Sequence, residues 1–188
     1  MYEELTATQL VDQRIDRFTG HIERPGRDFA EVVAQRVAPG VLEVDQVDRC
    51  DAALFAQVWA PGALVDYGGG ETGAAAWSDD LVARLRHMDR TQHQISNSLV
   101  EIDGDEACAE TMCTAYHRFT ESGMKLRMVV GGRYLDRLAR TPDGWRIASR
   151  RYVMDWNETE PSTMQVGEGR FARFTALGAR APHDPSCG

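Results

Sequence analysis

The second half of the chain is a succession of long β-type segments joined by tight-turn signals. Alternating apolar side chains mark four such segments, at residues 94–102, 106–119, 124–140 and 145–156. Between them stand Asp103-Gly104-Asp105, Glu121-Ser122-Gly123 and Pro142-Asp143-Gly144. Short glycine-containing connections of this kind join neighbouring strands in hairpins. The pattern therefore predicts an antiparallel meander and excludes a doubly wound parallel sheet.

The segments before the meander have mostly helical spacing. Helices are predicted at residues 3–23, 29–37, 41–59 (with a possible kink near Arg49) and 74–88, and a short strand at 63–67. The first three helices each end at or before a Pro-Gly pair. Helices followed by an antiparallel sheet are typical of an α+β domain, in which the helices cover one face of the sheet.

Composition limits the partners of this domain. The 188 residues contain 21 Lys+Arg and 29 Asp+Glu, a formal net charge of −8, and no basic patch of the kind that binds nucleic acid. We expect neither a membrane span nor a secretory signal. The sequence has no long apolar run, and its first residues contain no basic segment followed by an apolar one. Four cysteines without a CxxC pair indicate free thiols. The expected location is cytoplasmic.

The segment 106–119 predicts a pocket, because alternation assigns each of its side chains to one face of the sheet. One face carries only small residues from Ala107 to Ala115 and then His117. Small side chains opposite a helical layer leave volume unfilled, and His117 would point into that volume. The alternative is a core histidine that is hydrogen-bonded to the backbone.

The position of His93 relative to His117 depends on the turn that joins their strands. A three-residue loop at Asp103-Gly104-Asp105 would place His93 opposite Ala115, with the two imidazoles about 7 to 8 Å apart in one cavity. A two-residue turn would place them on opposite faces. The first register suits two histidines with different tasks on one substrate better than a shared metal.

Two competing interpretations have weak support. A metal site would need Asp48 or Asp51 beside the histidines, but no HxH or HExxH spacing occurs. The segment from Gly68 to Gly73 matches GxGxxG, yet no crossover helices follow it. We therefore expect no metal and no organic cofactor.

Three aspartates, Asp45, Asp48 and Asp51, recur every three residues along one edge of the predicted helix 41–59. A carboxylate near the boundary between helix and sheet needs a partner, and a histidine is a suitable one. The alternative is an exposed acidic edge.

Several segments in fixed order resemble one family. They are DRCDAALFAQVWAPGALVDYGG, TQHQISN, AYHRF, GGRYLDRLARTPDGWRIASR and RRYVMDW. Together they resemble the SnoaL-like branch of the nuclear-transport-factor-2-like (NTF2-like) superfamily, and most closely its scytalone dehydratase and dehydrochlorinase group. The resemblance implies a cone-shaped α+β barrel over residues 41–157, with a curved antiparallel sheet around one deep apolar pocket. Residues 1–40 would form a helical extension, and residues 158–188 a tail that acts as a lid or a disordered arm.

The resemblance also implies site residues. The family's helix aspartate falls on Asp48 and its catalytic histidine on His93, while a substrate-contacting tyrosine and a second histidine fall on Tyr67 and His117. A serine and an asparagine that contact substrate in scytalone dehydratase fall near Gly132 and Tyr134, so Tyr134 is expected to bind substrate. The tyrosine that often precedes the helix aspartate is replaced here by Val47.

These residues predict a cofactor-independent dehydratase that acts on a small cyclic or polyketide-like β-hydroxy carbonyl compound. His93 would remove a proton with the help of Asp48, Tyr67 would stabilise the enolate, and His117 would protonate the departing hydroxyl. An isomerase or cyclase on the same pair, and a small-molecule-binding module, remain open alternatives. Relatives are commonly oligomers, and Cys108, Met112 and Tyr116 on the outer sheet face favour a homotrimer or, alternatively, a dimer.

Overall fold

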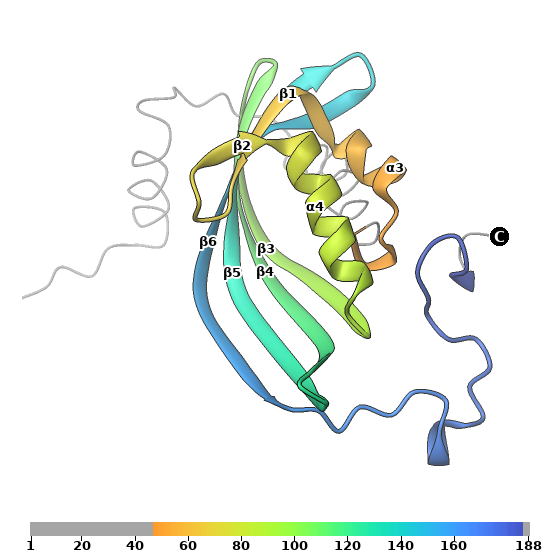
Figure 1. The fold of residues 1–188 in the computed structure, drawn as a ribbon. Coiled ribbons are helices and arrows are strands. Elements are labelled where there is room, and N and C mark those ends of the chain that lie inside the picture. Colours follow the sequence, from red (N-terminus) through yellow and green to blue (C-terminus); the bar gives the residue numbers. More distant parts are fainter. Residues whose placement is uncertain (1–46, 186–188) are drawn as a thin grey trace, which may run out of the picture.

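The structure, a computed structural model, describes residues 47–185 (Figure 1). The predicted helices 3–23 and 29–37, Asp45 and Cys187 lie outside these residues. The elements are α3 (Ala52–Phe55), η1 (Ala56–Val58), β1 (Trp59–Asp66), β2 (Glu71–Gly73), α4 (Ala74–Arg86), β3 (Arg90–Asp103), β4 (Glu106–Glu121), β5 (Met124–Thr141), β6 (Gly144–Pro161) and η2 (Gly169–Phe171).

The strands form one six-stranded sheet in the order β2-β1-β6-β5-β4-β3. Strand β1 runs parallel to β6, and all other neighbours are antiparallel. The sheet is curved and unclosed, and α3 and α4 lie on its concave side (Figure 1). The predicted α+β class and the meander are confirmed, although β6 continues past Trp156 to Pro161.

The predicted helix 41–59 is interrupted where the kink was expected. The helical turn that includes Val47 ends before Cys50, whose φ of 55° lies in the left-handed region. Asp51 then caps α3, because its side chain accepts a hydrogen bond from the amide of Leu54 at 3.1 Å. The C-terminal end of the predicted helix is wrong, since Trp59 begins strand β1.

The register of β3 on β4 arises in a way that the sequence analysis did not foresee. Asp103 pairs with Glu106, so the turn between them contains two residues and not three. A β-bulge then shifts the pairing by one residue, because Ser96 faces Met112 whereas Ser98 faces Thr111. The shift places His93 opposite Ala115 and on the same face as His117.

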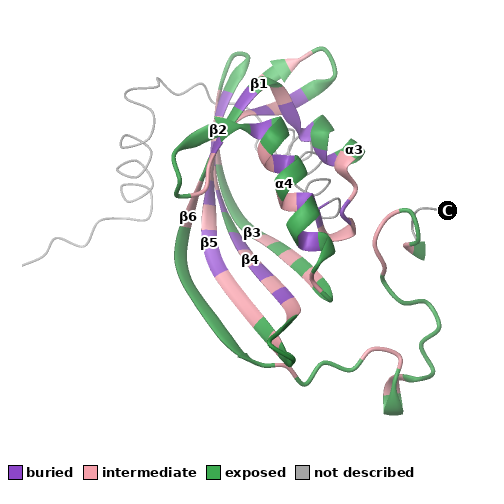
Figure 2. Cartoon of the chain, in the orientation of Figure 1, coloured by how far each residue is buried: buried purple, intermediate pink, exposed green. Residues whose placement is uncertain are grey.

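The hydrophobic core fills one end of the concave face (Figure 2). Phe55, Val65 and Ile147 are almost fully buried there, and the ring of Trp59 packs edge-on against Phe55 at 5.8 Å between centroids. A buried ion pair joins Arg150 to Asp136 at 2.7 and 2.8 Å. This packed end supports a cavity farther along the same strands.

Candidate active site

A cavity of about 580 Å³ lies between α4, the turn after β1 and the concave face of the sheet. Its lining includes small residues of β4, a set of aromatic side chains and both histidines predicted from the sequence. They are Val47, Tyr67, Gly69, Gly70, Glu71, Thr72, Trp77, Leu81, Arg84, His93, Cys113, Ala115, His117, Val130, Tyr134 and Tyr152. A volume of this size accommodates a small organic molecule.

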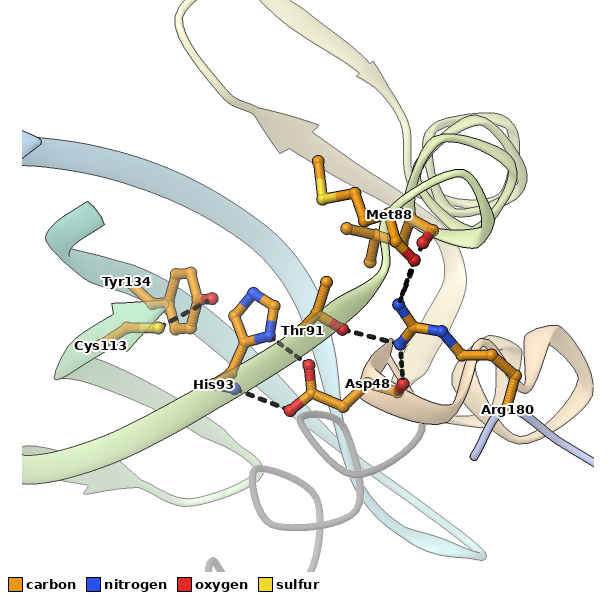
Figure 3. A network of polar contacts seen from close by, with 8 residues as sticks. Asp48, Met88, Thr91, His93, Cys113, Tyr134 and Arg180 are labelled. Atoms are coloured by element: carbon orange, nitrogen blue, oxygen red, sulfur yellow. Dashed lines mark hydrogen bonds and ion pairs between the residues drawn. The ribbon is translucent and has the colours of Figure 1, made fainter. Parts of the chain in front are cut away.

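Asp48 holds His93 at two points (Figure 3). One carboxylate oxygen lies 2.8 Å from the ring Nδ1 of His93, and the other accepts the backbone amide of His93 at 2.7 Å. The helical turn before Cys50 carries Asp48, and the first residues of β3 carry His93. This bidentate contact fixes the ring of His93 against the cavity wall and leaves Nε2 unengaged by Asp48.

The charge state of Asp48 follows from its surroundings. Burial alone would raise the pKa of this carboxyl, but the hydrogen bonds and charge of His93, together with the Thr91 hydroxyl, hold the pKa below its usual value. Asp48 is therefore ionised at neutral pH and acts as an acceptor. An acceptor at Nδ1 selects the tautomer of His93 that carries its proton on Nδ1.

His117 lies beside His93 in a different environment. The two ring centroids are 5.5 Å apart and the rings are perpendicular. His117 is only 9% exposed, and its Nδ1 makes no hydrogen bond within residues 47–185. Burial, reinforced by the charge of His93, lowers the pKa of His117 to about 4. At neutral pH His117 is therefore an uncharged imidazole that can donate a hydrogen bond but holds no excess proton.

Aromatic side chains form another wall of the cavity. Tyr67 stacks between Trp77 and Tyr152, with centroid distances of 4.2 and 5.2 Å. Tyr134 lies 5.7 Å from Tyr152 and also contacts the thiol of Cys113 at 3.2 Å. Burial, with the charges of Cys113 and Asp155, raises the pKa of Tyr152 to about 12. Its hydroxyl therefore stays protonated and can donate a hydrogen bond.

Comparisons with known proteins identify the family. The profile of the SnoaL-like domain matches residues 45–151, more than half of the chain. The chain belongs to the SnoaL-like domain family. No curated protein matches the sequence significantly.

Solved structures show the same NTF2-like fold for this SnoaL-like domain. A putative scytalone dehydratase from Novosphingobium aromaticivorans aligns with a TM-score of 0.60 at 17% identity, over 72% of this chain and 91% of that one. A hexachlorocyclohexane dehydrochlorinase, LinA type 2, aligns with a TM-score of 0.61 at 15% identity, over 74% and 97%. An NTF2-like protein from Salmonella enterica aligns with a TM-score of 0.58 at 17% identity, over 76% and 99%.

The SnoaL-like domain brings the sequence-predicted residues together. His93, Tyr67, His117 and Tyr134 line one cavity, and Asp48 lies directly behind His93. Gly69 and Gly70 line the cavity from a turn that leads into β2, which pairs antiparallel with β1. The glycine segment thus lacks the strand-to-helix crossover of a dinucleotide site.

Two further properties concern metals and membranes. Within residues 47–185, no three His, Cys, Asp or Glu side chains are grouped as they would be around a metal ion. Nor does this part of the chain contain a helix that is long and apolar enough to cross a membrane. The homotrimeric or dimeric assembly stays a prediction.

Three residues of the site escaped the sequence analysis. Tyr152 pairs directly with Tyr134 across β5 and β6, so correct strand alignment would have placed both in the cavity. Trp77 lines the cavity from α4, and helical spacing alone does not distinguish a cavity wall from a packed core. Arg180 contacts the backbone of Asp48 from the C-terminal segment. No local pattern around Arg180 indicates that contact.

Proposed function

We propose that this SnoaL-like protein is a cofactor-independent lyase that removes water from a small cyclic or polyketide-like β-hydroxy carbonyl compound. The observation that carries the proposal is the pair of hydrogen bonds by which Asp48 holds His93 at the wall of a mostly apolar cavity. A carboxylate on Nδ1 orients the ring and stabilises the imidazolium that forms when Nε2 accepts a proton.

The first step breaks a C–H bond. Nε2 of His93 removes the proton α to the substrate carbonyl, and the electron pair of that bond moves toward the carbonyl oxygen. The resulting enolate requires hydrogen-bond donors, which the hydroxyl of Tyr67 supplies from the aromatic wall. The ring of Tyr67 is fixed between Trp77 and Tyr152, so its hydroxyl needs little reorganisation.

The second step breaks the C–O bond at the β carbon. The enolate electrons form the carbon–carbon double bond, and the departing hydroxyl leaves as water after it takes a proton. His117 has a lowered pKa of about 4, so it is neutral when His93 acts as a base. The proton is therefore returned by the His93 imidazolium, while His117 donates a hydrogen bond to the leaving oxygen.

Two of the similar structures bear names that describe eliminations, a putative scytalone dehydratase and a dehydrochlorinase. The names describe the removal of water and of hydrogen chloride, and both support the coarser assignment to small-molecule lyases. An isomerase is the second candidate, because a neutral His117 gives little acid assistance to a leaving group. The same base would then return its proton to a different carbon.

The test is a set of cyclic β-hydroxy ketones incubated with the wild type, His93→Gln, Tyr67→Phe and a control, His87→Gln. His87 is exposed at the end of α4 and does not line the cavity. We expect the wild type and the control to form the conjugated enone, detected by ultraviolet absorption and by loss of water in mass spectrometry. His93→Gln should be slower by about 10³-fold, and Tyr67→Phe by about tenfold, the value of one hydrogen bond.

Equal rates in the wild type and His93→Gln would contradict the proposal. Exchange of the substrate α proton for deuterium in D₂O, without loss of water from any compound of the set, would favour the isomerase.

A further inference from the structure

Arg180 connects the C-terminal segment to the Asp48–His93 pair. Its guanidinium donates to the backbone carbonyl of Asp48, and to the hydroxyl oxygen of Thr91 at 2.7 Å (Figure 3). It also donates to the carbonyls of Leu85 and Met88 at 3.1 and 3.4 Å. One side chain thus ties together the turn that carries Asp48, the end of α4 and the start of β3.

The turn behind Asp48 needs such support. Cys50 adopts a φ of 55°, a conformation that costs a non-glycine residue about 1 kcal/mol or more. Three consecutive carbonyls of this turn are held from outside it. Arg180 binds that of Asp48, the amide of Ala181 binds that of Arg49 at 2.8 Å, and Arg86 binds that of Cys50 at 3.2 Å.

Arg180 also reaches the carboxylate of Asp48 indirectly. The oxygen of Thr91 accepts a hydrogen bond from Arg180, which directs the proton of that hydroxyl away from the guanidinium. The Thr91 hydroxyl in turn helps to hold the pKa of Asp48 low against burial, which raises it, although the lowering effect of His93 is larger. The segment that carries Arg180 is itself anchored, because Asp184 accepts the amide of Ala179 at 2.8 Å and lies 3.7 Å from the guanidinium of Arg49.

We propose that Arg180 is a positioning residue for the Asp48–His93 pair, holding the Asp48 turn and Thr91 so that the carboxylate meets both Nδ1 and the backbone amide of His93. This role rests on the proposed function, since it concerns the geometry of the base. It makes residues 179–184 part of the active-site architecture. A positively charged guanidinium is required, because no other side chain offers five N–H donors to four separate acceptors.

The test compares Arg180→Gln, Arg180→Lys and a matched control, Arg173→Gln. Arg173 belongs to the same C-terminal segment, but its guanidinium stacks on the ring of Phe174 and contacts no residue of the pair. The primary readout is the His93 Nδ1 proton in NMR spectra, whose exchange with solvent reports the hydrogen bond to Asp48. The backbone amide signal of His93 reports the second hydrogen bond, and neither measurement requires a substrate.

We expect both Arg180 variants to exchange the Nδ1 proton at least tenfold faster than the wild type, while Arg173→Gln stays within twofold. Arg180→Lys separates geometry from charge, since it keeps the charge but cannot bridge all four acceptors. Dehydration by both variants should show a kcat at least tenfold lower, with KM changed less than threefold. Amide signals of the β4–β6 strands, unchanged from the wild type, show that each variant is folded.

An unchanged exchange rate in Arg180→Lys would overturn the proposal, as would an equal acceleration in Arg173→Gln. If Arg180→Gln does not fold, the lysine variant alone decides. Faster exchange in a protein that dehydrates no compound would support the positioning role and reject the proposed lyase function, so the two failures are distinguishable.

Discussion

The two sides of the cavity are held together by different forces. At the histidine side, Asp48, His93 and Arg180 are joined by hydrogen bonds, of which those that His93 donates to Asp48 measure 2.7 and 2.8 Å. At the aromatic side, Tyr67 and its neighbours are joined by ring contacts of 4.2 and 5.2 Å between centroids. Hydrogen bonds weaken steeply with angle and distance, whereas stacked rings tolerate small shifts.

The hydrogen-bonded side therefore sets the orientation of the His93 ring, and the aromatic side sets the shape of the cavity. The histidine side must keep one proton on one nitrogen, so the loss of a single acceptor changes its chemistry. In the proposed function, the aromatic side excludes water and surrounds the substrate, and only the hydroxyl of Tyr67 takes part in the chemical step. A displaced ring that leaves this hydroxyl in place therefore changes binding more than it changes the chemical step. Substitutions on the two sides should therefore divide between kcat and KM.

The largest effect is expected from Asp48→Asn. One side-chain oxygen must still accept the backbone amide of His93, which turns the new NH₂ group toward Nδ1. The ring then carries its proton on Nε2 and cannot act as a base there. We expect kcat to fall by about 10³-fold with little change in KM, and the ¹⁵N shifts of the His93 ring to show the opposite tautomer.

Asp51→Asn is the matched control, because Asp51 caps α3 and asparagine caps helices equally well. If His93 keeps its wild-type tautomer in Asp48→Asn, the histidine side tolerates the loss of its charged acceptor. The proposed difference between the two sides of the cavity would then be wrong.

A second prediction concerns acid stability. The pKa of His117 is about 4 in the folded protein, whereas the ordinary pKa of histidine is 6.5. The unfolded chain therefore binds more protons between these values, and the folded state loses stability as pH falls through this window. We expect the free energy of unfolding in urea to fall by about 3 kcal/mol between pH 7 and pH 4 from this group alone.

The comparison variant is His117→Gln, which has no titrating ring and should lose most of this pH dependence. The exposed His87→Gln should keep it. If the unfolding free energies of His117→Gln and the wild type depend equally steeply on pH, the pKa of His117 is not lowered by burial. His117 is then hydrated and belongs, as a charged group, to the polar side of the cavity.

Much of this fold could be predicted, because its signals are local. Three hairpin signals predicted the meander. The alternation in residues 106–119 predicted a small-residue face, of which Cys113 and Ala115 line the cavity, whereas Ala107 and Ala109 pack in the core. The edge of aspartates left open whether one carboxylate meets a histidine or all are exposed, and the family resemblance pointed to Asp48, which does contact His93. Alternation and helix-edge spacing are short-range consequences of backbone geometry.

The sequence left the register of His93 open, because it depended on the length of the turn after β3, and that length alone does not decide it. The turn after β3 has two residues, which without compensation would have placed the two histidines on opposite faces. The bulge at Asn97, with a φ of 32°, restores the alignment. Asparagine tolerates this conformation, but many other residues would have the same flanking pattern, so the bulge is not readable from the sequence.

The contact of Arg180 with Asp48 could not be predicted from the sequence. It joins residues separated by 132 positions in the chain. The segment between β6 and Arg180 is mostly exposed, with no periodicity that would place it. Long-range polar contacts of this kind depend on the finished surface of the folded domain.

The smallest predicted effect comes from Gly132, which lies against the side chain of Tyr152 on the aromatic side of the cavity. A Cβ at Gly132 would lie 2.5 Å from both the hydroxyl of Tyr152 and the carbonyl of Val153. Because that carbonyl belongs to the backbone of β6, Gly132→Ala must shift β6 itself, and Tyr152 moves with it. We expect a loss of about 2 kcal/mol in unfolding free energy and a KM raised several-fold, with kcat and the His93 tautomer unchanged.

The neighbouring Gly131→Ala is the sharpest control for that substitution. A Cβ there would collide with the indole of Trp156 at 2.3 Å, but Trp156 is 48% exposed and can move into solvent. Gly131→Ala should therefore cost less than about 1 kcal/mol and leave KM unchanged. The β5–β6 register shifts between Gly131 and Gly132, which marks a β-bulge there. If both alanine variants raise KM equally, this bulge shapes the cavity as a unit, and the contact of Gly132 with Tyr152 has no separate effect. If only Gly132→Ala raises KM, the position of the Tyr152 ring sets substrate binding independently of the hydrogen-bonded side.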